Sequence, residues 1–306
     1  MRLIITFDDN PTGQLKRAGF ADRVVPLDRR FVWGRLPSPS KLKNWTRADY
    51  IALSEFCERF DAIELWVDPE PNSQLQLLWV LEYLRPHEDV VSRLNLAQTN
   101  TSIDGLRTEE WIAQRPRAVP IHSDHLEVAS AAWAAWRALT PEAWFDLLAQ
   151  DLSAIPRLRS TVAALLEELP TRTSGLGKTE MRLLELVAAG NDHPYDLFPG
   201  HEKPNELITY GYWEVGRLLD GLARGPKPAV SGLTEGPFDL DMHNSQDRHD
   251  RYKNSTLSLT DLGKQILAGT DDFSRHNPIH RWWAGTELTN DRLWRWDPDN
   301  QSLIAP

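Results

Sequence analysis

The sequence predicts an α/β protein whose N-terminal part is a parallel, doubly wound sheet with helices. Strand-like apolar segments alternate with helical patterns over the first hundred residues, and such alternation favours parallel strands joined by helical crossovers. Two of these segments, residues 3–7 and 63–67, are each followed by a polar turn and then by a helical pattern. A strand–turn–helix unit of this kind places polar groups at the carboxyl edge of a parallel sheet.

The first predicted domain covers residues 1–105 and contains four strands separated by helices. The strands are expected at 3–7, 24–28, 63–67 and 90–96, and the helices at 12–19, at 46–60 and around 75–84. In the second helix, apolar side chains recur at three- and four-residue spacing and form one stripe, which is typical of a helix packed against a sheet.

Residues 106–172 are expected to be helical and to link or cover the sheet. A helix start is indicated at residue 108, and Ser123 or Asp124 is expected to cap a helix that runs to residue 139. Pro141 suits the first position of the next helix, where a missing N–H removes no hydrogen bond. A further helix is expected after Pro156, ending near residue 169.

The order of the elements expected in residues 173–270 predicts a winged-helix-like module. A helix at 178–189, a short turn of helix at 193–198 and a helix at 211–223 precede two strands, one at Val230 and one at 257–259, around a long polar loop. A capped helix at 260–267 closes this module. The last segment, 271–306, is rich in tryptophan and is expected to form a hairpin that turns at residues 297–300.

The composition restricts the possible functions of this 306-residue chain. A net charge of −10 argues against broad nucleic-acid binding. A single cysteine, Cys57, is incompatible with an internal disulfide framework and suits a reducing cytoplasm, so a cytoplasmic location is expected. No apolar run approaches the roughly 20 residues that a membrane span requires, so membrane association is not expected.

The two polar turns form the predicted site for a small-molecule or protein partner. If the strands at 3–7 and 63–67 are neighbours, the polar side chains that follow them converge at one edge of the sheet. The candidate ligand-binding residues are Asp8, Asp9, Asn10, Thr12, Gln14, Asp68, Glu70, Asn72 and Gln74. The competing interpretation is structural, because Asp, Asn, Thr and Pro are also common turn and capping residues.

A more specific hypothesis uses the carboxylates of the same turns. Asp8 or Asp9, together with Asp68 and Glu70, supplies the oxygen ligands that Mg²⁺ prefers, and would suit a metal-dependent phosphohydrolase or nuclease. The sequence shows no basic cluster beside these turns for binding phosphates, so this hypothesis ranks below simple ligand binding.

Two further patterns resemble nucleotide or DNA sites. Residues 175–179, Gly-Leu-Gly-Lys-Thr, lack the earlier glycine of a phosphate-binding loop, since Arg172 stands there, and a capped turn explains them. The winged-helix-like module offers a DNA-binding regulator as an alternative, with Arg248, Arg251 and Lys253 on its wing. Acidic residues among these cations favour a structural or protein-binding module instead.

Several motifs are similar to those of the bacterial proteins grouped as domain of unknown function 1835. They are Leu65-Trp66-Val67-Asp68 followed by Gln74-Leu75-Gln76-Leu77-Leu78, Gly175-Leu176-Gly177-Lys178-Thr179-Glu180, Trp282-Trp283-Ala284-Gly285 and Leu293-Trp294-Arg295-Trp296-Asp297. The resemblance spans nearly the whole chain and implies the domain layout given above and a bacterial cytoplasmic protein. It implies no particular chemistry. The leading expectation is therefore a ligand- or protein-binding regulatory protein.

Overall fold

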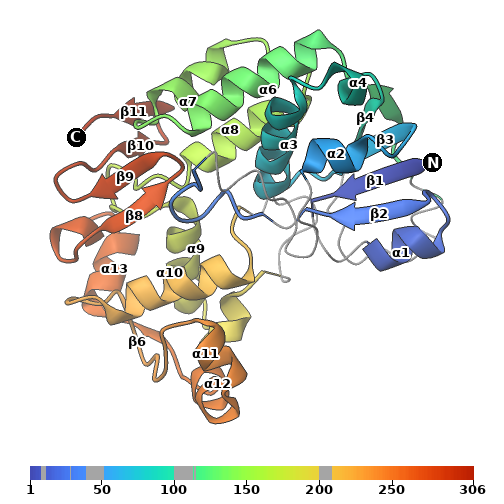
Figure 1. The fold of residues 1–306 in the computed structure, drawn as a ribbon. Helices are drawn as coiled ribbons and strands as arrows, with labels where there is room; N and C mark the ends of the chain where they lie inside the picture. Colours follow the sequence, from blue (N-terminus) through green and yellow to red (C-terminus); the bar gives the residue numbers. More distant parts are fainter. Residues whose placement is uncertain (8–11, 28, 39–51, 100–112, 114, 200–208) are drawn as a thin grey trace. The chain divides into compact units, whose positions relative to one another are not determined.

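The computed structural model describes residues 1–7, 12–27, 29–38, 52–99, 113, 115–199 and 209–306, and has the predicted mixed α/β fold (Figure 1). The chain forms two compact units. The first consists of Met1–Leu139 and Ala143–Val162, and the second of Thr140–Glu142 and Ala163–Pro306. The finer division into four segments stays a prediction. In the described residues, no helix combines the length and apolarity needed to cross a membrane.

A five-stranded sheet with the order β2-β1-β3-β4-β5 is the centre of the first unit. Its strands are β1 (Arg2–Thr6), β2 (Arg23–Pro26), β3 (Ala62–Val67), β4 (Leu94–Gln98) and β5 (Ala118–Pro120). The first four are parallel, which confirms the predicted parallel sheet, whereas β5 pairs antiparallel with β4. β5 was not predicted, because it is only three residues long and ends in proline at a sheet edge.

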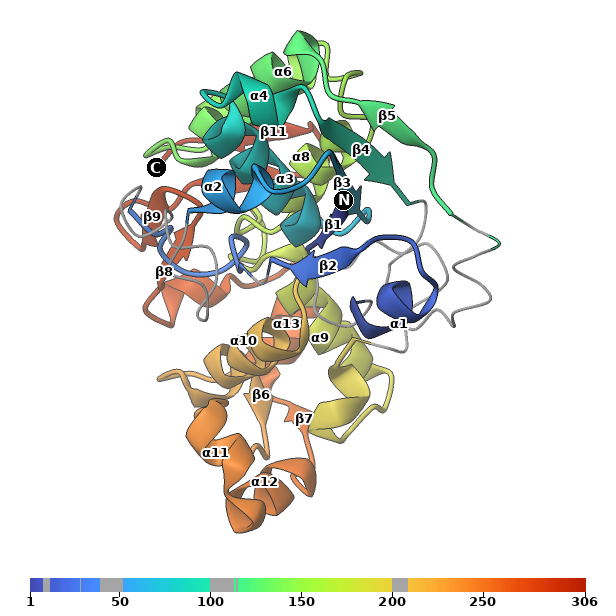
Figure 2. The ribbon, with the colours of Figure 1, turned by 45° about the vertical axis from the view of Figure 1, so that its right-hand side comes forward.

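Helices cover both faces of this sheet. The helices in this part of the chain are α1 (Thr12–Arg17), α2 (Leu53–Cys57), α3 (Pro71–Leu84), α4 (Glu88–Val91), α6 (Ser123–Trp136), α7 (Glu142–Asp146) and the 3-10 turn η2 (Leu147–Ala149). On one face, Leu15 of α1 packs with Ile4, Val24 and Trp66. Figures 1 and 2 show α3 on the opposite side, the face to which strand alternation directs Ile5 and its cross-strand partners Val25 and Leu65.

One predicted strand boundary is wrong. The strand expected at 90–96 begins only at Leu94, because Val90 and Val91 belong to helix α4. Glu88 and Asp89 lie in the first turn of α4, where negative charge stabilises the helix, and Val90 is buried from that helix. Val90 and Val91 are typical strand residues, but here they belong to a short helix.

The second unit is built from short helices and three two-stranded sheets. Its helices are α8 (Leu158–Leu166, which begins in the first unit), α9 (Lys178–Ala188), η3 (Pro194–Leu197), α10 (Tyr212–Arg224), α11 (Leu240–Asn244), α12 (Gln246–Lys253), α13 (Asp261–Leu267) and η4 (Phe273–Arg275). Its paired strands are β6 (Val230–Ser231) with β7 (Ser258–Leu259), β8 (His280–Trp283) with β9 (Thr286–Thr289), and β10 (Arg295–Asp297) with β11 (Ser302–Ile304).

The segment between β6 and β7 is helical and differs from the long polar loop that was expected. Asp239 caps α11 by accepting a hydrogen bond from the Met242 backbone N–H at 2.8 Å, and α12 follows directly. These helices were not predicted, because their residues are almost all polar and only Met242 and Tyr252 are buried. The winged-helix identity of this unit stays a prediction.

The terminal hairpin is confirmed. Asp297 stabilises the turn between β10 and β11, since its Oδ1 accepts hydrogen bonds from the backbone N–H groups of Asp299 at 3.1 Å and Asn300 at 3.2 Å. The preceding hairpin, β8–β9, was not expected. Its turn contains Ala284 with a φ of 55°, a conformation that the sequence pattern does not indicate.

Candidate functional site at the carboxyl edge of the parallel sheet

The predicted site depends on whether the first and third strands are neighbours, and they are. Strands β1 and β3 pair in parallel, with Thr6 opposite Trp66, so their carboxyl ends meet at the same edge (Figure 2). β2 lies on the other side of β1, and the chain then crosses to β3 and β4. The strand order therefore reverses between β1 and β3, and in open α/β sheets ligands bind in the crevice at such a reversal.

The candidate residues after β1 are only partly described. Asp8, Asp9 and Asn10 lie outside the described residues. Thr12 is the first residue of α1 and Gln14 lies within that helix, but their side chains are also outside the described part. The structure therefore places the end of β1 at this edge and leaves the contribution of these five side chains as a prediction.

The candidate residues after β3 lie together around the first turn of α3. Asp68 is 4% exposed, and its Oδ1 accepts a hydrogen bond from the backbone N–H of Glu70 at 3.0 Å. Glu70 is the N-cap residue of α3 and is half-buried. The Asp68 contact forms a tight turn that holds the start of α3 against the end of β3, so both residues lie at the carboxyl edge of the sheet.

The Asn72 amide is a structural clamp. Its Nδ2 donates to the carbonyl of Arg29 at 2.7 Å, and its Oδ1 accepts from the backbone N–H of Phe31 at 2.8 Å. The segment that follows β2 is thereby fixed to the first turn of α3. A turn or capping role for Asn72 involves only residues close to it in the sequence. Its hydrogen-bond partners are instead 41 and 43 residues away.

Gln74 is also directed into the protein. It is 1% exposed, and its Nε2 donates to the carbonyl of Asp68 at 2.6 Å. Its Oε1 accepts a weaker hydrogen bond from Gln98 Nε2, at the end of β4, at 3.4 Å. Gln74 therefore connects the ends of two neighbouring strands through the first turn of α3.

Gln76 was not among the predicted site residues, although it has a comparable role. Its Nε2 donates to the carbonyl of Phe7 at 2.9 Å, and its Oε1 accepts from the backbone N–H of Arg29 at 2.9 Å. Gln76 is fully buried, and a buried amide needs partners for both of its polar atoms. A glutamine between two leucines of a helix, as in Leu75-Gln76-Leu77, is the sequence signal that identifies such a residue.

Aromatic packing anchors the segment after β2. Phe31 packs edge-on against Trp79 of α3 and Trp133 of α6, with ring centroids at 5.8 and 5.0 Å, and its carbonyl accepts from Trp136 Nε1 at 3.3 Å. The Arg29 guanidinium lies over the Trp79 ring at 5.4 Å, and burial lowers the pKa of this guanidinium. Arg29 is thus held beside the start of α3 by contacts that the sequence did not indicate.

We expect Asn72→Ala to lower the free energy of unfolding by about 2 kcal/mol, since it leaves the carbonyl of Arg29 and the N–H of Phe31 without these bonds. Urea unfolding followed by tryptophan fluorescence measures the change. Hydrogen exchange of the Phe31 amide should also be faster in the variant than in the wild type. Unchanged exchange at Phe31 would show that Asn72 does not hold this segment.

Within the described parts of the chain, no group of three or more His, Cys, Asp or Glu side chains is placed to hold a metal ion. The magnesium hypothesis also needs Asp8 or Asp9, which lie outside those parts. It therefore stays a prediction.

Comparisons with known proteins add no functional assignment. Neither protein-family models nor curated proteins give a match to this chain.

Proposed function

We propose that this is a regulatory protein of the bacterial cytoplasm that binds a small hydroxylated or phosphorylated molecule, such as a nucleotide, at the carboxyl edge of its parallel sheet. The single observation that carries the proposal is the reversal of strand order between β1 and β3. It supports a crevice at the place where polar residues are concentrated in the sequence. The resemblance to domain of unknown function 1835 is the basis for the bacterial and cytoplasmic parts of the proposal.

The two carboxylates suggest how such a ligand would be recognised. Asp68 and Glu70 follow the central strand β3, and carboxylate oxygens accept hydrogen bonds from ligand hydroxyl groups such as those of a ribose. Arg29 adds positive charge on the neighbouring segment. The amides of Asn72, Gln74 and Gln76 hold this edge in place, so the crevice is organised before a ligand arrives.

DNA binding through the second unit receives less support. Arg248 and Arg251, the cations expected on its wing, both pair with Glu235, at 3.1 and 2.8 Å. The hydrogen bond from the Gly236 N–H, followed by those from Arg251 and Arg248, lowers the pKa of Glu235 to about 2, so its charge persists at neutral pH. A carboxylate that holds both guanidinium groups reduces their attraction for DNA phosphates.

A thermal-shift screen with nucleoside mono-, di- and triphosphates, with and without Mg²⁺, tests the proposed function. We expect at least one nucleotide to raise the melting temperature of the wild type. In Glu70→Gln, the affinity for that nucleotide should fall at least about tenfold, because a hydrogen bond to a charged group is lost. Glu82→Gln is the matched control, since Glu82 lies near the opposite end of α3.

The control variant should retain the wild-type shift. A nucleotide shift of equal size in the Glu70→Gln variant contradicts the proposed site. Absence of any shift across the panel contradicts the proposed ligand class.

A further inference from the structure

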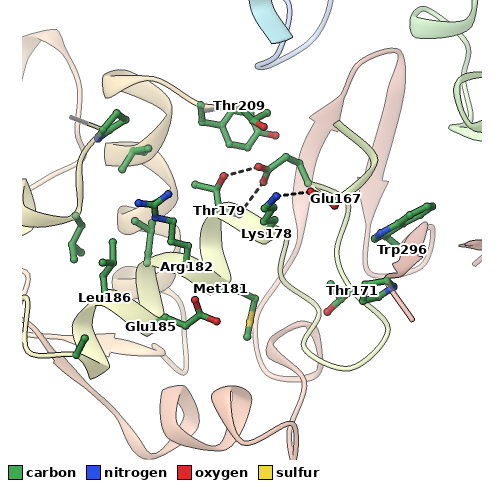
Figure 3. A pocket seen from close by; sticks show the side chains of 18 residues that line it. Glu167, Thr171, Lys178, Thr179, Met181, Arg182, Glu185, Leu186, Thr209 and Trp296 are labelled. Carbon is green, nitrogen blue, oxygen red and sulfur yellow. Dashed lines mark hydrogen bonds and ion pairs between the residues drawn. The ribbon is translucent and has the colours of Figure 1, made fainter. Parts of the chain in front are cut away.

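The second unit contains a cavity that is separate from the sheet edge. Its volume is about 680 Å³, within the range of small-molecule sites, and it lies along α9 (Figure 3). Much of its wall is apolar. The apolar side chains include Met181, Leu186, Leu197, Pro199, Val215 and Trp296.

A buried carboxylate, that of Glu168, lines this cavity beside its apolar wall. Glu168 is 4% exposed, and it accepts hydrogen bonds from the Thr179 hydroxyl at 2.6 Å and the Thr179 backbone N–H at 3.1 Å, drawn as dashed lines in Figure 3. An ionised carboxylate has about four lone-pair sites, so Thr179 occupies about half of them. The group retains capacity to accept hydrogen bonds from a ligand.

The glycine-rich segment before α9 explains why Glu168 lies so close to that helix. A Cβ atom at Gly177 would come within 2.5 Å of the Glu168 carbonyl oxygen, so only glycine permits this approach. Gly177 is the N-cap residue of α9, and its N–H donates to Glu180 Oε2 at 2.8 Å. The segment that resembles a phosphate-binding loop is thus a close-packed helix start, as predicted.

The cations near Glu168 are paired with other carboxylates. Arg281 of β8 bonds to Glu180 Oε2 at 2.8 Å, and Lys178 bonds to Glu167 at 2.6 Å. Among the residues that the structure describes, none of the Lys, Arg or His side chains forms an ion pair with Glu168. Burying a carboxylate without a paired cation is unfavourable, which favours a ligand that brings its own positive charge.

The surrounding groups also act on the protonation of Glu168. Burial raises its pKa to about 7, the nearby Glu180 acts in the same direction, and Thr179 and Arg281 oppose it. On the α10 side, burial raises the pKa of the Tyr210 hydroxyl well above its ordinary value, and Glu168, Glu180 and Glu214 contribute to that increase. Tyr210 therefore remains neutral at physiological pH, and Glu168 titrates near neutrality.

We propose that this cavity binds a small organic cation, a primary amine with an apolar body, whose ammonium group donates hydrogen bonds to Glu168. The apolar wall takes the body of the ligand, and Thr179 orients the carboxylate. Three carboxylates (Glu167, Glu168 and Glu185) and two cations (Lys178 and Arg182) line the cavity, so with Glu168 ionised the lining carries one net negative charge, which favours a cationic over an anionic ligand. This inference is independent of the function proposed for the sheet edge.

Isothermal titration of the full-length protein with benzylamine and with benzyl alcohol tests the proposal. The two probes have nearly the same shape and differ in charge. At about pH 8 we expect benzylamine to bind in the millimolar range and at least about tenfold more tightly than benzyl alcohol. At about pH 6, protonation of Glu168 should weaken benzylamine binding about tenfold.

Glu168→Gln should abolish both the preference for the amine and its dependence on pH. Glu167→Gln, which changes a carboxylate on the same cavity that is paired with Lys178, should retain both. The comparison of benzylamine with benzyl alcohol is made on the wild-type protein, so its outcome does not depend on the folding of a variant. Equal binding of the two probes, no benzylamine binding, or an amine preference that survives in Glu168→Gln each overturns the proposal.

Discussion

As the pH rises from about 4.5 to about 7, the wild type is expected to lose about 3 kcal/mol of folding free energy through Glu168. The Glu168→Gln variant should not show this loss. Burial raises the folded-state pKa of Glu168 to about 7, while the unfolded chain titrates near the ordinary value of 4.5. Between these values the folded state binds more protons than the unfolded state. The stability that Glu168 contributes is therefore fully present below about pH 4.5 and is lost as the pH rises through about 7.

Urea unfolding of both proteins at about pH 5 and about pH 8 measures this difference. The wild type should lose more stability than Glu168→Gln over this interval, and the difference between the two losses reports Glu168 alone. Glu167→Gln should behave like the wild type, because Glu167 is much more exposed than Glu168. Parallel pH profiles for the wild type and Glu168→Gln would show that Glu168 does not titrate with a raised pKa.

Gly216→Ala is expected to destabilise the second unit by about 3 kcal/mol. A Cβ atom at Gly216 of α10 would lie 2.2 Å from Cδ1 of Phe238. Phe238 cannot move aside easily, because it is 1% exposed and packs among several aromatic rings. Those rings belong to Phe198, Tyr212, Trp213 and Tyr252.

Gly221→Ala is the matched control in the same helix. A Cβ atom at Gly221 meets no atom within 4 Å, so this substitution should stabilise the protein by up to about 1 kcal/mol through helix propensity. Thermal unfolding followed by circular dichroism distinguishes the two variants. Equal effects of the two alanines would show that α10 does not pack on Phe238 as described.

Local sequence patterns were sufficient to predict most of the sheet. Strands such as β1 and β3 are short, mostly apolar and buried after their first residue, and a helix follows each, so the sequence pattern and the parallel pairing agree. Helices α11 and α12 were missed because they are polar and bury few side chains. The antiparallel edge strand β5 was missed because three residues carry too little periodic signal.

The sequence predicted that the two polar turns would lie at one sheet edge if their strands were neighbours, but not the contacts of their side chains. Polar residues after β1 and β3 were expected to converge if these strands were neighbours, and the strand pairing meets this condition. The roles of Asn72 and Gln76 depend on partners in the segment after β2 and at the end of β1, contacts that no local pattern encodes. Glu168 was missed for the same reason, since its burial arises from tertiary packing of α9 and α10 around the cavity.

Hydrogen-exchange mass spectrometry with and without the most stabilising nucleotide tests the proposed ligand site most directly. Binding at the crevice between β1 and β3 predicts slower exchange at residues 29–31 and 68–76, because those backbone segments form its described edge. Slower exchange confined to the second unit, or unchanged exchange at residues 29–31 and 68–76, would contradict ligand binding between β1 and β3.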